Sequence, residues 1–179
     1  MMKLGKRSLL VGVHQFIWHP ATVAMAWWKL FGLPSWKELV CIVIHDWGYW
    51  HSPNMDGSQG QAHTEFGGHL ASRWFGEYYG NLCRYHSRHY AQVHDMQPSK
   101  LCWADKLSIQ YEPWWFYIFR AWLSGELSEY RRNAARALAI PVTATHHCWF
   151  ILIKEMLVAM AIQQNPSSMP YVRSTEGQE

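Results

Sequence analysis

Signals for the start and the end of helices recur along almost the whole chain, and they constrain its fold more than any other feature. The clearest is Ser35-Trp-Lys-Glu38, a capping box that directly precedes an apolar run at 39–44. The loop 50–62, rich in Gly, Pro, Asn and Asp, is the one long interruption. Helical patterning also covers 20–30, 64–79, 81–94, 98–112, 114–123, 128–138 and 143–164. We therefore expect an all-α fold, a bundle of about seven helices.

The composition supports one folded domain. Hydrophobic residues make up 49% of the 179 residues and charged residues 16%, which excludes disorder as the dominant state. The length is that of one ordinary domain. We predict a single domain over 1–179, with additional C-terminal helices at 111–164 and a flexible tail at 165–179.

Charge and cysteine usage exclude several classes of partner. Sixteen Lys and Arg against thirteen Asp and Glu give a net charge of +3, too small to indicate a nucleic-acid partner. The four cysteines form no CxxC pair, so neither a disulfide framework nor a zinc knuckle is expected. We interpret them as reduced thiols, mostly buried.

Two apolar stretches are long enough to compare with targeting or membrane segments. The run 8–18 follows a basic N-terminus, as in a signal peptide, but His14 and Gln15 interrupt it. The run 148–162 is shorter than the roughly 20 residues a membrane span needs, and two charged residues lie in its middle. We therefore predict no membrane span and a cytoplasmic protein.

Histidine is unusually frequent, with eleven in the chain, and several recur once per successive predicted helix. His45-Asp46 at the end of one helix could, taken alone, be a polar helix end favoured by the helix dipole. Helices packed antiparallel can instead bring such residues to one place in a bundle interior. Imidazoles with carboxylates suit Fe, Mn, Zn and similar ions. The candidate metal ligands are His19, His45, Asp46, His63, His86 and Asp105.

Three short sequence words surround these candidates. They are Val43-Ile-His-Asp-Trp-Gly48, His63-Thr-Glu-Phe-Gly67 and Leu101-Cys-Trp-Ala-Asp-Lys-Leu107. In this order and context, the set resembles the HD-domain superfamily of metal-dependent phosphohydrolases. The resemblance covers about 14–110, which we expect to form the metal-binding core of an HD-type domain.

The resemblance implies a centre for two divalent metal ions. The family's single-metal set is matched by His19, His45, Asp46 and Asp105. The two further histidines of its two-metal members are matched by His63 and His86. Asp46 would then bridge two ions, of Fe, Mn, Co or Zn, and a metal-bound hydroxide would be the nucleophile. The implied reaction is hydrolysis of a phosphoester of a small phosphorylated metabolite or nucleotide.

One position departs from the family pattern. Many members have Lys where this chain has Tyr49, so a phosphate-binding cation must come from elsewhere. Arg88 is best placed, because its planar fork suits phosphate. The candidate substrate-binding residues are Arg88, Lys106, Arg84 and Tyr49, with Lys100 a further cation nearby in sequence.

His89 leaves one assignment open. It lies three residues after His86, on the same helix face, so either residue could be the ligand. In the other role, His89 would donate a proton to the leaving oxygen. The candidate catalytic residues are therefore Asp46 and His89. We interpret His14 as structural or surface. For the Trp27-Trp28 and Trp114-Trp115 pairs we favour core packing, with one member of each pair directed away from the other.

Two other functions stay open. The same six ligands would serve a di-iron oxygenase of the wider superfamily, as in inositol oxygenase. A non-catalytic nucleotide-binding module is a third reading, which the complete ligand set argues against. The expected partner is a small phosphorylated substrate, and assembly into homo-oligomers stays open.

Overall fold

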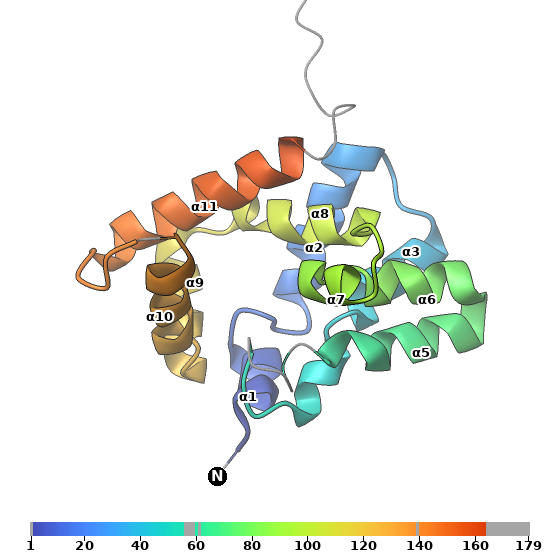
Figure 1. Cartoon of the computed structure of the whole chain (residues 1–179), viewed down its shortest axis with the longest axis horizontal. Coiled ribbons are helices and arrows are strands. Elements are labelled where there is room, and N and C mark those ends of the chain that lie inside the picture. Colours follow the sequence, from blue (N-terminus) through green and yellow to red (C-terminus); the bar gives the residue numbers. More distant parts are fainter. Residues whose placement is uncertain (1, 56–59, 61, 139, 164–179) are drawn as a thin grey trace, which may run out of the picture.

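The computed structural model describes residues 2–55, 60, 62–138 and 140–163. These residues form ten α-helices and two short 3₁₀ helices and contain no strand (Figure 1). The predicted all-α class is confirmed, but the predicted number of about seven helices is too low.

Five helices supply most of the first hydrophobic core. They are α2 (Trp18–Phe31), α3 (Trp36–Ile44), α5 (His63–Phe75), α6 (Glu77–Arg84) and α8 (Lys100–Ser108). α5 packs against α6, and α2 packs against α8. The fully buried Trp27, Ile42 and Leu101 belong to the core between them. This burial holds the helix ends that carry the polar residues of the site.

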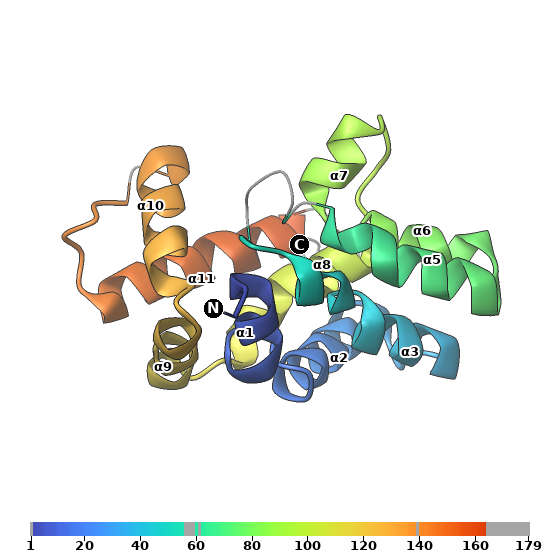
Figure 2. The same ribbon diagram turned by 90° about the horizontal axis from the view of Figure 1, so that it is seen from below.

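A second hydrophobic core lies under the C-terminal helices α9 (Trp114–Ser124), α10 (Leu127–Leu138) and α11 (His146–Gln163). Its largest buried side chains are Trp149 and Phe150. α11 packs against both α8 and α9, so it joins the two groups of helices (Figure 1). The remaining elements are α1 (Leu4–Val11), α7 (Arg88–Val93) and the 3₁₀ helices η1 (Trp47–His51) and η2 (Ile109–Tyr111). Figure 2 shows α1 beside α9, which it contacts together with η1.

The extra helices arise at three places where the sequence predicts no helix end or no helix. α1 begins at Leu4 and was not predicted as a helix. The segments predicted at 64–79 and 81–94 form three helices. Gly76 ends α5 because its φ of 94° lies in the left-handed region, which a helix cannot continue through. The Ser87 side chain caps a new start by accepting the Tyr90 N–H at 3.3 Å.

Other predictions have clear outcomes. The Ser35 capping box is confirmed, with the Glu38 N–H donating to Ser35 Oγ at 3.3 Å and the Ser35 N–H donating to Glu38 at 2.7 Å. All four cysteines are unpaired, and Cys148 alone of them is exposed. No helix within the described ranges is long and apolar enough to cross a bilayer.

The domain boundaries stay predictions. The predicted tail 165–179 lies outside the described residues, as do positions 56–59 and 61 of the predicted loop.

Candidate metal centre

The six predicted ligands come from five places in the sequence and meet in one buried cluster. Five of them, all but Asp105, are at most 6% exposed. Most lie at helix ends, where the chain can turn a side chain into the interior. His19 is in the first turn of α2, His45 and Asp46 follow α3, His63 begins α5, His86 follows α6, and Asp105 lies within α8.

Asp46 is at the centre of this cluster, and its two oxygens face different partners. Oδ2 lies 3.1 Å from Nε2 of His19 and 3.1 Å from Nε2 of His45. Oδ1 lies 3.5 Å from Nε2 of His63 and 3.4 Å from Nε2 of His86. Asp105 joins the first group, with Oδ1 3.3 Å from Nε2 of His19. The cluster therefore consists of two groups that share one carboxylate.

The histidine rings are held in a single tautomer by the backbone. In His45, His63 and His86, Nδ1 lies 2.7, 2.6 and 2.5 Å from the carbonyl oxygen three residues earlier. A carbonyl oxygen only accepts, so each Nδ1 carries the hydrogen and donates it. The neutral ring then has its lone pair on Nε2, directed into the cluster. This is how metal-binding histidines are usually oriented.

Several buried polar atoms of the cluster have no hydrogen-bond partner within the protein. Nε2 of His19, Nε2 of His45 and Oδ2 of Asp46 are buried and make no hydrogen bond. Such atoms cost free energy unless something binds them. Ligand atoms of His19, His45 and Asp105, and those of His45, Asp46 and His86, lie within 4.8 Å of one another. Imidazole nitrogens with carboxylate oxygens are a suitable donor set for a divalent transition metal, so the residues fit such ions.

The carboxylates of the cluster are ionised. Burial raises the pKa of Asp46. The neighbouring His45 and then His14 outweigh burial and hold this pKa well below its ordinary range. Burial acts in the same way on Asp105, and Lys106 is the main group that holds its pKa well below the ordinary range. Two ionised carboxylates in a buried site give it a preference for cations.

The pKa values of the imidazoles are shifted in two directions. Burial and then the neighbouring His86 lower the pKa of His63 to about 3, and burial lowers the pKa of His45. These rings are neutral, as ligands must be. Burial alone would lower the pKa of His19, but Asp105 and then Asp46 raise it to about 10. The position beside His19 therefore favours a positive charge.

Two residues of the His-Asp-Trp-Gly-Tyr segment hold His63 in place. A Cβ at Gly48 would lie 2.0 Å from the carbonyl oxygen of His63, so only glycine allows this approach of η1 to α5. The Tyr49 ring stacks on the His63 ring at a centroid distance of 3.8 Å. Tyr49 also lines the cavity in front of the cluster, so its predicted contact with substrate stays a prediction.

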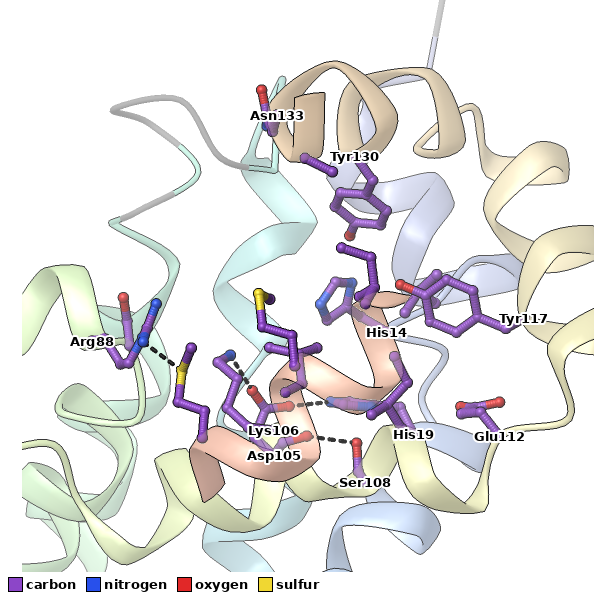
Figure 3. Close-up of a pocket in the computed structure, with 18 of the residues that line it drawn as sticks. His14, His19, Arg88, Asp105, Lys106, Ser108, Glu112, Tyr117, Tyr130 and Asn133 are labelled. Carbon is purple, nitrogen blue, oxygen red and sulfur yellow. Dashed lines mark hydrogen bonds and ion pairs between the residues drawn. The ribbon is translucent and has the colours of Figure 1, made fainter. Parts of the chain in front are cut away.

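A cavity of about 470 Å³ opens onto the cluster. Figure 3 shows Asp105 between His19 and Lys106, whose Nζ lies 2.9 Å from Asp105 Oδ2. Arg88 and His89 also line the cavity, and both are exposed residues of α7. With Tyr49, four of the predicted substrate or proton-transfer residues thus share this space.

The structure does not bring all the candidates together. Arg84 does not line the cavity, because its guanidinium pairs with Glu77 at 2.6 Å and Glu65 at 3.4 Å. Of the two alternative histidines, His86 directs Nε2 at Asp46, whereas His89 lies at the cavity edge. The geometry favours His86 as the ligand.

His14, which the sequence suggests to be structural or surface, also lines the cavity. Its Nδ1 lies 2.9 Å from Ser8 Oγ and 3.3 Å from Oε1 of the fully buried Glu126. The Glu126 carboxylate also accepts hydrogen bonds from Ser8 at 2.6 Å, the Tyr130 hydroxyl at 2.9 Å and the Val13 N–H at 3.0 Å. No sequence signal links positions so far apart, so this pairing could be found only in the fold.

Comparisons with protein-family models, with curated proteins and with solved structures found no match for this chain. What the centre does must therefore follow from its own geometry and chemistry. That geometry is a buried cluster of His and Asp residues that could hold metal ions, at the wall of a cavity.

Proposed function

We propose that the chain is a metal-dependent phosphohydrolase with a two-ion centre, of the type found in the HD-domain superfamily that it resembles. The observation that supports this most is the position of Asp46. Oδ2 lies beside His19 and His45, whereas Oδ1 lies beside His63 and His86. A carboxylate bridging two ions needs such an arrangement, with each oxygen directed at a separate set of ligands.

Each ion has its own set of side chains. Oδ2 of Asp46 would hold the first ion together with His19, His45 and Asp105. Oδ1 would hold the second ion together with His63 and His86. Bound divalent ions would supply an activated water at neutral pH and would neutralise charge on a phosphate.

The other cavity residues suit the phosphate and the leaving group. Lys106 has its ammonium fixed by Asp105 at 2.9 Å, so its charge is held beside the ligand cluster. Arg88 offers a planar fork of donors to phosphate oxygens at the cavity edge. His89, on the same helix, is within the cavity lining and can donate a proton to a leaving oxygen.

The test is release of inorganic phosphate from a panel of phosphoesters that includes p-nitrophenyl phosphate and nucleotides. Protein purified without chelator should be active, lose activity after EDTA treatment and regain it with Mn²⁺, Co²⁺, Zn²⁺ or Fe²⁺. Asp46→Asn should lose at least about a thousandfold, within the range seen when essential catalytic groups are removed. Asp95→Asn is the matched control, because Asp95 is exposed and has a φ of 52°, which Asn tolerates.

Two outcomes would contradict the proposal. One is full activity in Asp46→Asn or in the chelated protein. The other is no phosphate release from any substrate while the iron-loaded protein consumes oxygen, which would indicate the oxygenase instead.

A further inference from the structure

One wall of the cavity is apolar and belongs to the C-terminal helices. α11 contributes five lining residues, which are Trp149, Ile153, Met156, Leu157 and Met160. Their spacing of four, three, one and three residues places them on one face of the helix. Over eleven residues, this stripe extends about 16 Å along α11, at about 1.5 Å per residue. Tyr117 of α9 and Ala134 of α10 continue the same wall.

Apolar surface of this kind is costly to leave in contact with water. Protein interiors contain few voids larger than a water molecule, and burial of apolar surface is the main favourable contribution to folding. Trp149 and Ile153 are themselves buried in the second core, whereas Met156, Leu157 and Met160 are half-buried and line the cavity of about 470 Å³. These three side chains therefore indicate a ligand that covers them. Met156 and Met160 are flexible and polarisable, so they can adapt to apolar groups of different shape.

Polar groups near this wall are already bonded within the protein. Glu112 accepts from Arg120 at 2.6 Å and from the Trp18 indole at 3.0 Å. Ser108 donates to the Asp105 carbonyl at 2.7 Å, and the Tyr130 hydroxyl donates to Glu126. A nucleobase needs several donors and acceptors at its edges, whereas an aliphatic or aryl group needs only apolar contact. The wall is better suited to the second kind of ligand.

Arg88, a cationic residue that lines the cavity, contacts the last residue of the apolar stripe. Nη1 of Arg88 lies 2.5 Å from Sδ of Met160, the last residue of the stripe, and Lys106 lies beside the ligand cluster. Figure 3 shows Arg88 and Tyr117 at opposite ends of the cavity. A ligand that fills this space has an anionic group near Arg88 and Lys106 and a carbon-rich part along α11.

We propose that the substrate is the phosphomonoester of an amphiphilic alcohol, whose apolar chain lies along the α11 stripe. This inference rests on the proposed phosphohydrolase function for the phosphate, and on the α11 wall for the apolar chain. The wall is built by residues after 111, which lie outside the part of the chain that resembles the HD-domain superfamily.

The experiment measures binding of linear n-alkylphosphonates from butyl to decyl by isothermal titration calorimetry, below their micelle concentrations. The full chain is used, purified without chelator. Kd should fall about fourfold for each added methylene, since burial of one CH₂ is worth about 0.8 kcal/mol. Met156→Gln should flatten this dependence on length. Leu152→Gln is the matched control, because Leu152 lies one turn before Met156 but does not line the cavity and is 40% exposed, and it should leave the dependence unchanged.

The n-alkyl phosphates of the same lengths are assayed in parallel for phosphate release, with AMP as the nucleotide. Equal Kd values at all lengths, no binding at any length, or equal flattening by Leu152→Gln would overturn the inference. Hydrolysis with AMP preferred over every alkyl phosphate would also overturn it, while leaving the phosphohydrolase standing. Length-dependent binding without hydrolysis would support the amphiphilic ligand and contradict the phosphohydrolase.

Discussion

Nε2 of His63 and Nε2 of His86 lie 3.0 Å apart, although both rings already direct Nδ1 at a backbone carbonyl. Where both rings are neutral in this tautomer, their Nε2 lone pairs face each other with no hydrogen between them. A cation shared by these two nitrogens and Oδ1 of Asp46 removes the repulsion. The pair is therefore the strongest local indication of a second ion.

Ion binding should stabilise the folded chain. A divalent ion at 100 times its Kd contributes about 2.7 kcal/mol, because the unfolded chain has no preformed site. In a chain of this length, that raises the melting temperature by about 5–10 °C. Thermal unfolding followed by circular dichroism, with EDTA and with added Mn²⁺ or Zn²⁺, measures the shift. Identical melting curves with and without metal would contradict a structural contribution from the ions.

The two histidines that sequence alone leaves as alternatives should behave differently. His86→Ala should remove one of two metal equivalents, because it deletes a nitrogen 3.4 Å from Oδ1 of Asp46. His89→Ala should retain both, because His89 is exposed at the cavity edge, and it should lower turnover instead. Metal content by mass spectrometry separates these outcomes. Loss of an ion from the His89 variant alone would reverse the assignment.

Gly48→Ala should displace His63, although Gly48 is not itself a candidate ligand. The new Cβ would lie 2.0 Å from the His63 carbonyl oxygen, so the backbone of α5 must move. We expect a loss of about 2 kcal/mol in the free energy of unfolding, typical of overpacking, together with weaker binding of the second ion. Gly76→Ala is the control, since a Cβ there meets no atom within 4 Å. Its left-handed φ of 94° should cost about 1 kcal/mol and leave metal content unchanged. Equal metal content in both variants would argue against a role for Gly48 in placing His63.

Glu126 should make stability depend on pH. Burial raises its pKa, but hydrogen bonds from His14, Ser124 and Ser8 bring it below its ordinary 4.5. A lowered pKa in the folded state contributes stability above pH 4.5, and this contribution is lost as the pH falls through the folded-state pKa. Glu126→Gln should thus cost about 2 kcal/mol at pH 7 and progressively less below pH 4.5. Urea unfolding at several pH values measures this, with Glu155→Gln, an exposed position on α11, as control. A difference that does not change with pH would show that the charge of Glu126 is not what matters.

Local signals made much of the fold predictable. Helix class, the Ser35 capping box and the helices at 114–124 and 100–108 follow from periodicity, caps and breakers, which act within a few residues. The break at Gly76 was harder, because glycine is tolerated inside helices and its positive φ is set by the packing of α5 against α6. The Trp pairs show the same limit. Trp27 is buried and Trp28 exposed, but Trp114 and Trp115 are both exposed, so the core interpretation of the second pair is wrong.

The candidate ligands could be listed from the sequence because four of them, His45, Asp46, His63 and Asp105, sit in recognisable words. Which oxygen of Asp46 faces which histidine could not, since that depends on how α2, α3, α5 and α6 pack. The Glu126 contact with His14 and the α11 wall were equally hidden, because both join the N-terminal half of the chain to its last third. Long-range packing of this kind leaves no periodic signal in a single sequence.

The central claim is that Asp46 joins two ion sites, and the most direct test is metal stoichiometry by mass spectrometry on protein purified without chelator. We expect two equivalents per chain in the unmodified protein and in Asp95→Asn, and none retained in Asp46→Asn. A single equivalent in the unmodified protein, or two equivalents in Asp46→Asn, would contradict the bridging role of Asp46.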